Sequence, residues 1–247
     1  MSALRLDASA PLGLAYACLL AGLALWVWAR ARAVSRASAV VNGLAWAAAA
    51  LLGVYVLAQA AFAPRAMFVQ AGDFLAVGAL GVLLGSRLGR ADADKEAVPF
   101  AVALVALTHV ILWPPAAAPG HPAQTTLLYA LGAGLRALGA GACIAAAPGW
   151  WSAQSSERVS WREWAGLAAV GLGFALYSAW GWLHWGVIWR DDPRLNLMLG
   201  GWLILLAGQQ TKWARAVKTL GVAVLVVGAL CADLIAGGWT HLSFVAW

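Results

Sequence analysis

A tryptophan-rich polar segment between two apolar stretches is the first place in this chain where chemistry is expected. The segment reads WGVIWRDDPR and runs from Trp185 to Arg194. Together with the residues just before it, it places four tryptophans within ten residues: Trp180, Trp182, Trp185 and Trp189. Aromatic side chains collect at membrane interfaces, but here they adjoin Asp191, Asp192 and Pro193. This combination favours a surface for a flat, aromatic, anionic ligand, and haem is the ligand that fits it best.

Two isolated histidines, His121 and His241, stand beside other apolar stretches and are candidate axial ligands of haem iron, a role that neutral imidazole commonly takes. His121 lies in the proline-rich segment PPAAAPGHPA, whose fixed φ angles would hold it in place. His241 follows Gly237-Gly238, a typical helix C-cap signal. Facing each other, the two could ligate one iron, and Arg190 and Arg194 could pair with the propionates. The alternative, about equally favoured by general ligand chemistry, is two ordinary interfacial histidines.

The other two histidines are interpreted as structural. His109 lies near one end of an apolar stretch, and His184 stands between Trp182 and Trp185. Ionisable residues inside a membrane are functional candidates by default. However, His109 is close enough to the surface to hydrogen-bond water, and His184 is placed to orient the tryptophan loop.

Arg136 is the one arginine in the middle of an apolar stretch. Because a central arginine costs about 2.5–3.5 kcal/mol on insertion scales, it should face other helices and have a partner. The sequence does not name that partner. Asp233 is interpreted as a hydrogen-bonding residue near the interface, and Gln209 and Gln210 as a polar helix end.

The composition places the chain in a lipid environment. Of its 247 residues, 63% are hydrophobic and only 11% are charged, more apolar surface than a soluble core of this size can hide. The net charge of +6 resides in short loops, so it indicates topology and not nucleic-acid binding. The three cysteines, Cys18, Cys143 and Cys231, lie inside apolar stretches without a CxxC pair. They therefore support neither a disulfide framework nor a thiol relay.

The apolar stretches predict an all-α polytopic membrane protein with about eight transmembrane helices. We expect the first stretch to be a retained helix and not a cleaved signal peptide. The stretches cover 11–29, 39–62, 69–86, 97–113, 124–147, 164–183, 194–210 and 217–237. The fourth and seventh are near the lower length limit for a span. Glycines of the fifth stretch predict close helix packing in lipid: Gly132, Gly134, Gly139 and Gly141.

Basic residues alternate between the loops and indicate the orientation. They follow the first, third, fifth and seventh stretches: Arg30, Arg32, Arg36, Arg87, Arg90, Lys95, Arg158, Arg162, Lys212, Arg215 and Lys218. The intervening loops hold few lysines or arginines. The positive-inside rule then places both termini on the outer, periplasmic side of a bacterial inner membrane. The segments with His121, the tryptophans and His241 would all lie on that outer face.

From residue 114 onward the chain resembles the haem-handling cytochrome c assembly proteins of the WWD-domain family, of CcsA and CcmC type. The family signature WGxxWxWDP, in the outer loop between two helices, is matched by Trp185, Gly186, Trp189, Asp192 and Pro193, with Arg194 following. The outer histidines of the family are matched by His121, eight residues before Tyr129-Ala130, and by His241 in the tail. Residues 1–113 match only as apolar helices.

Two positions depart from the family pattern. Asp191 replaces the third signature tryptophan, and Gln210 stands where CcsA-type proteins carry a histidine within the membrane. The second departure favours the CcmC pattern, which has one outer haem site. Trp202 falls where CcsA-type proteins often have a tryptophan.

The resemblance implies a protein that presents haem b at its outer face for cytochrome c maturation. His121 and His241 would be axial ligands, Trp185, Trp189 and Asp192 the platform, and Arg194 a propionate partner. Residues 1–113 would form N-terminal helices and 114–247 the haem-handling core. A haem chaperone, an apocytochrome or other membrane subunits would be partners, in a haem lyase or delivery system. The alternatives are a structural or haem-binding subunit of a respiratory or photosynthetic complex, a regulator of haem biosynthesis and, less favoured, a transporter.

Overall fold

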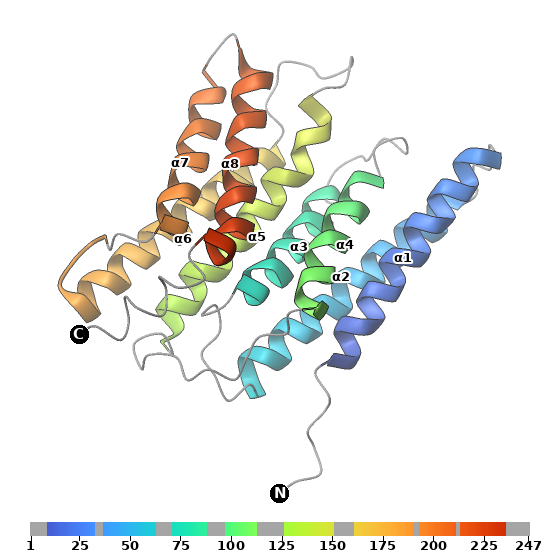
Figure 1. Cartoon of the computed structure of the whole chain (residues 1–247), viewed down its shortest axis with the longest axis horizontal. Helices are drawn as coiled ribbons and strands as arrows, with labels where there is room; N and C mark the ends of the chain where they lie inside the picture. Colours follow the sequence, from blue (N-terminus) through green and yellow to red (C-terminus); the bar gives the residue numbers. More distant parts are fainter. Residues whose placement is uncertain are drawn as a thin grey trace, which may run out of the picture.

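The computed structural model describes residues 9–32, 37–62, 71–87, 97–112, 126–150, 161–189, 193–210 and 213–235. Within these ranges the chain forms eight α-helices and no strand. The helices are α1 (Ser9–Arg32), α2 (Ala37–Phe62), α3 (Ala71–Arg87), α4 (Ala97–Leu112), α5 (Leu127–Trp150), α6 (Trp161–Trp185), α7 (Pro193–Gly208) and α8 (Ala214–Ile235) (Figure 1). The all-α prediction is confirmed, and each helix ends within a few residues of its predicted position.

Length and composition make this a multi-pass membrane protein. Four of the described helices are long and apolar enough to cross a bilayer: Ala10–Arg32, Ser38–Ala61, Leu127–Trp150 and Trp161–Trp185. They belong to α1, α2, α5 and α6, whereas α4 and α7 have 16 residues each, as the short fourth and seventh stretches predicted. Large apolar side chains such as Leu57 and Leu183 are exposed on the outside of the bundle. Helices satisfy their own backbone hydrogen bonds, which a lipid environment requires.

Consecutive helices alternate in direction, and the bundle has two halves (Figure 1). The helices α1 to α4 enclose one apolar core, which includes Leu19, Leu52 and Phe100. The helices α5 to α8 enclose a second core, which includes Trp180 and Met198. The two halves meet where α3 packs against α5.

Small residues allow α5 to lie close to both α3 and α6. A Cβ added to Gly139 of α5 would lie 2.6 Å from the carbonyl oxygen of Gly166 in α6. A Cβ on Gly81 of α3 would strike the backbone of α5, and one on Gly141 would strike the backbone of α3. Helices in lipid pack by such close backbone contact. The prediction of close packing by α5 glycines is therefore confirmed for Gly139 and Gly141.

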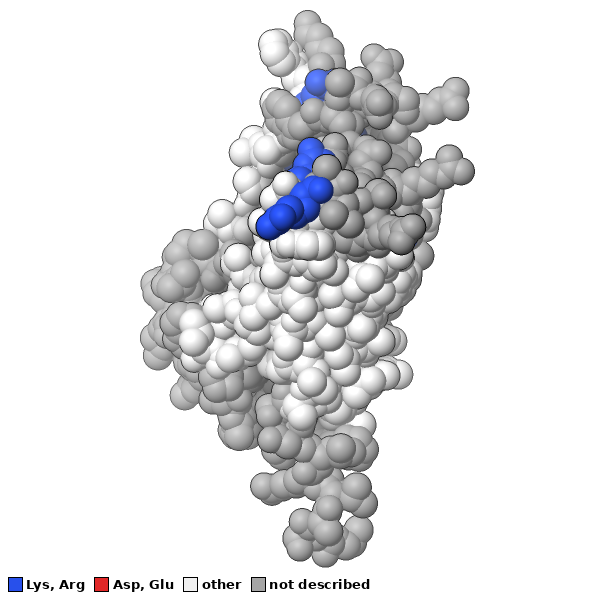
Figure 2. Space-filling model, turned by 90° about the vertical axis from the view of Figure 1, so that its right-hand side faces the viewer, with Lys and Arg blue, Asp and Glu red and all other residues white. Residues whose placement is uncertain are grey.

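The alternating directions give the bundle two chemically different ends. At what we call the basic end, Arg162 of α6 donates to the Gly85 carbonyl oxygen of α3 (3.5 Å), and Arg87 donates to Asn42 of α2 (3.1 Å). The described basic side chains in the helix turns at this end are Arg30, Arg32, Arg87, Arg162, Arg215 and Lys218. Figure 2 shows blue side chains gathered toward one end of one face. We call the opposite end, where α6 finishes and α7 begins, the aromatic end.

Candidate functional site

The segment from Trp185 to Trp189 folds back along α6 because of two glycines. The helix ends at Trp185, and Gly186 follows with a φ of 69°, a left-handed conformation that glycine adopts without a Cβ penalty. A Cβ on Gly181 would lie 2.8 Å from the Val187 carbonyl oxygen. The returning chain therefore runs directly over the last turn of α6, and a side chain at Gly181 would push it away.

The fold-back carries Trp189 to the place where α6 faces α7. The centroid of its ring lies 5.8 Å from that of Phe174 and 6.1 Å from that of Tyr177. Its indole N–H donates to the Asn196 side-chain oxygen in the first turn of α7 at 2.9 Å. Further along α7, Trp202 donates to a backbone carbonyl oxygen of α6 at 2.8 Å. These two tryptophans hold α7 and the returning segment against α6.

Trp180 is the centre of a larger group of rings. Its side chain is buried, and its ring centroid lies 4.9 Å from Tyr129 of α5, 5.3 Å from Tyr177 and 6.2 Å from Trp185. We name as the aromatic cluster the six residues Tyr129, Phe174, Tyr177, Trp180, Trp185 and Trp189. Four of them are buried, whereas Trp185 and Trp189 are half-buried. The two signature tryptophans are thus the members through which the cluster reaches the surroundings.

Arg136 lies against the aromatic cluster as a buried cation. Its guanidinium carbon is 4.7 Å from the centroid of Tyr177 and 5.5 Å from that of Phe174. The side chain is 1% exposed, and Gly173 leaves room for it, because a Cβ there would lie 2.6 Å from its Cγ. Aromatic faces attract a cation electrostatically. The prediction that Arg136 faces the bundle is confirmed, and these rings are among its partners.

The structure describes the side chains of only some of the predicted haem-site residues. Trp185 and Trp189 are both in the aromatic cluster. Arg194 belongs to the first turn of α7, but its side chain is outside the described part. The remaining predicted residues lie outside the described ranges: His121, His241 and Asp192. The arrangement described here therefore concerns the aromatic platform and leaves the iron ligands as a prediction.

The other two histidines lie in helices near the aromatic end. The ring of His184 is exposed and lies 5.8 Å from that of Trp180. His109 is half-buried in the last turn of α4, directly after Thr108, whose hydroxyl shares a 3.0 Å hydrogen bond with Tyr16 of α1. Their interpretation as structural residues stays a prediction.

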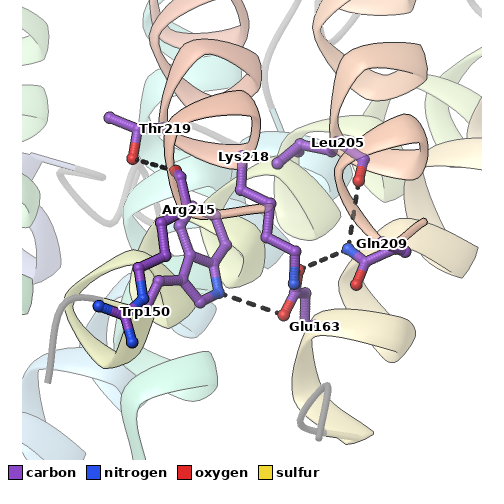
Figure 3. A network of polar contacts seen from close by, with 7 residues as sticks. All are labelled: Trp150, Glu163, Leu205, Gln209, Arg215, Lys218 and Thr219. Carbon is purple, nitrogen blue, oxygen red and sulfur yellow. Dashed lines mark hydrogen bonds and ion pairs between the residues drawn. The ribbon is translucent and has the colours of Figure 1, made fainter. Parts of the chain in front are cut away.

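A second polar site, which the sequence did not reveal, lies at the basic end (Figure 3). Glu163, in the first turn of α6, is 2% exposed. Its Oε2 accepts a hydrogen bond from the Trp150 indole of α5 at 3.2 Å. Its Oε1 accepts one from Gln209 at 2.6 Å and pairs with the Lys218 ammonium of α8 at 2.9 Å. We call these four residues the Glu163 cluster; its carboxylate joins α5, α6 and α8 and the residue that follows α7.

The Glu163 cluster corrects two interpretations made from the sequence. Gln209 does follow the last turn of α7, but its side chain binds a buried carboxylate and is more than a polar helix end. Lys218, counted only as a topology marker, is buried, and its ammonium lies 5.5 Å from the Trp150 ring centroid. The available signal was a lone acidic residue in the first turn of an apolar helix. Its pairing with a lysine 55 residues away could not be read from spacing.

The geometry of the Glu163 cluster is that of a structural clamp. A buried ion pair is maintained when its geometry is good and its remaining polar atoms are hydrogen-bonded. The carboxylate has one cation and two neutral N–H donors, each from a different part of the chain. Across the ranges given above, no three His, Cys, Asp or Glu side chains come together as they would to hold a metal ion.

Comparisons with protein-family models, with curated proteins and with solved structures give no match for this chain. The functional argument therefore depends on the residues and their geometry.

Proposed function

We propose that this protein binds haem b at its aromatic end and presents it at the outer membrane face for cytochrome c maturation. The observation that carries the proposal is the fold-back of the signature segment, which brings Trp185 and Trp189 into one aromatic cluster above a buried arginine. A porphyrin is a flat aromatic ring with two carboxylates. An aromatic surface with a nearby cation complements both of its features.

Chain connectivity supports a role for the two outer histidines. Thr126, five residues after His121, directly precedes α5 at the aromatic end. Five residues span at most about 18 Å. Ile235, six residues before His241, ends α8 beyond the level at which Gly228 approaches Met198 of α7. The segments that carry the two proposed ligands therefore both leave the bundle at the end that holds the aromatic cluster.

The described surface at this end fits the rest of the ligand. Beside the half-buried Trp185 and Trp189, the side chains of Trp182, Val187 and Ile188 are exposed and apolar. The two signature tryptophans would bear against the porphyrin edge, and Asp192 would complete the platform. His121 and His241 would hold the iron axially, while Arg190 and Arg194 would pair with propionates. When bound, haem supplies the vinyl groups that become attached to cytochrome c, and an apocytochrome Cys-x-x-Cys-His segment would supply the thiols.

The membrane placement that goes with this function has eight spans and both termini on the outer side of a bacterial inner membrane. The gathering of basic side chains at one end supports this orientation, since cytoplasmic loops carry the excess of lysine and arginine. Two exposed tryptophans of α6, Trp164 and Trp182, support the depth. They are 18 residues apart, or about 27 Å along a helix, close to the thickness of the hydrocarbon core.

A second candidate is a structural subunit of a larger respiratory or photosynthetic membrane complex. The observation that favours it is the packing of the aromatic rings against one another, with Trp189 already bonded to Asn196. Such packing would also be expected of a purely structural core. Co-purification in a stable electron-transfer complex, without haem bound to this chain, would favour this candidate.

The ligand assignment is tested by absorption spectra of the detergent-purified, haem-loaded protein. The wild type is expected to give a six-coordinate, low-spin b-type spectrum. His121→Ala and His241→Ala should each become five-coordinate or lose haem, with affinity falling by about tenfold or more. His109→Ala, which removes an imidazole near the aromatic end without touching the proposed ligands, should leave the spectrum unchanged. A wild-type spectrum in both outer-histidine variants would overturn the bis-histidine assignment.

A further inference from the structure

The basic end presents more positive than negative charge among its described side chains. Six described arginines and lysines lie in the helix turns there. The acidic side chain described among them, Glu163, is buried and paired with Lys218. Arg30, Arg32 and Arg215 are exposed, and no red side chain is visible on the face drawn in Figure 2. A surface of this kind attracts anionic lipid headgroups.

Arg162 is the arginine at this end whose position is most specific for a ligand. It enters from the first turn of α6 and reaches the last turn of α3, where its Nη1 donates to the Gly85 carbonyl oxygen over a long 3.5 Å. Its Nε is shielded from solvent and has no hydrogen-bond partner among the described residues. Arg87, two residues after Gly85, adds a second guanidinium to the same turn of α3. A phosphate oxygen is the acceptor that such a guanidinium binds best.

Exposed tryptophans place Arg162 at the level of lipid headgroups. Trp161 and Trp164 flank it on α6 and are 59% and 47% exposed, and Trp213, just before α8, is 69% exposed. Tryptophan side chains in such positions sit at the boundary between hydrocarbon and headgroups. A guanidinium within one turn of them lies where phospholipid phosphates lie, and not in the hydrocarbon.

We propose that the corner between the end of α3 and the start of α6 is a binding site for the phosphate of an anionic phospholipid, with Arg162 as its principal donor. The apolar faces beside Trp161 and Trp164 would hold the acyl chains. The site is at the opposite end of the bundle from the aromatic cluster and does not depend on haem binding.

Native mass spectrometry of the full chain, released from mild detergent and titrated with defined lipids, tests the proposal. Phosphatidylglycerol should be retained more strongly than phosphatidylcholine of the same chain length. Arg162→Gln should lower the phosphatidylglycerol affinity by about fivefold and leave the phosphatidylcholine affinity unchanged. The matched control is Arg32→Gln, which removes an exposed arginine at the same end from α1 and should have little effect. Circular dichroism of both variants checks that the helices are retained.

Three results would overturn the proposal. Equal retention of the two lipids by the wild type would exclude selectivity for the anionic headgroup. Equal losses in Arg162→Gln and Arg32→Gln would show attraction by the whole basic surface and not a site. Complete displacement of phosphatidylglycerol by millimolar inorganic phosphate would show that the corner binds free phosphate and not lipid. If Arg162→Gln loses helicity, Arg162→Lys, which keeps the charge but not the planar fork, is expected to retain an intermediate affinity, and wild-type affinity in that variant would contradict the assignment.

Discussion

Replacing Lys218 by methionine is expected to lower the free energy of unfolding by about 3–5 kcal/mol, because it leaves the Glu163 carboxylate buried without its cation. The ammonium and the carboxylate oxygen are 2.9 Å apart, and both side chains are almost fully buried. Methionine fills nearly the same volume as the lysine stem, so the loss measures the uncompensated charge and not a cavity. The measurement is unfolding of the purified protein in mixed detergent micelles, followed by circular dichroism.

Two companion variants separate the ion pair from a general charge effect. Arg215→Met removes a neighbouring cation of α8 whose side chain is exposed, and it should change stability by no more than about 0.5 kcal/mol. The double variant Glu163→Gln/Lys218→Met removes both charges and should recover most of the loss, since the neutral amide can still accept from Trp150. Equal effects of Lys218→Met and Arg215→Met would show that the Glu163 cluster does not hold the helices together.

Trp180→Ala is expected to destabilise the C-terminal half by about 3 kcal/mol or more, because it empties the centre of the aromatic cluster. Trp180 is 2% exposed and contacts rings of both α5 and α6. Without it, Tyr129 and Trp185 lose their common neighbour, and no adjacent side chain is large enough to fill the space. Thermal unfolding in detergent, followed by circular dichroism, measures the effect.

The matched control for Trp180→Ala is Trp182→Ala, two residues further along the same helix. Trp182 is 60% exposed and makes no described ring contact with the cluster. Its removal should change the thermal midpoint only slightly, within the range of ordinary surface substitutions. Similar midpoints for the two variants would contradict the central role given to Trp180 in the packing of the aromatic cluster.

The sequence alone was sufficient for the helices and for the tryptophans of the candidate site. Uninterrupted apolar stretches with arginines and lysines at alternate loops predict membrane helices and their relative directions, because the bilayer imposes one length and one charge rule on every span. Arg136 could likewise be assigned to the interior, since an arginine in mid-span is too costly to face lipid. These inferences depend on composition and order, which a sequence displays directly.

What the sequence could not supply were contacts between residues far apart in the chain. The return of Trp189 to Phe174 depends on the positive φ of Gly186 and on the missing Cβ of Gly181, and neither requirement is visible before the turn is built. The Glu163 cluster draws its members from four different segments, so no local pattern announces it. Lys218 resembled any other basic residue near a cytoplasmic loop until its burial was known.

The most direct test of the account is a haem titration of the detergent-purified wild-type protein, followed by its absorption spectrum. The account predicts saturation at about one haem per chain with a six-coordinate b-type spectrum, because one pair of outer histidines serves a single site. No saturable binding, even with excess haem, in a preparation whose helices are intact by circular dichroism would contradict haem presentation. That result would leave the aromatic cluster as part of a structural membrane subunit.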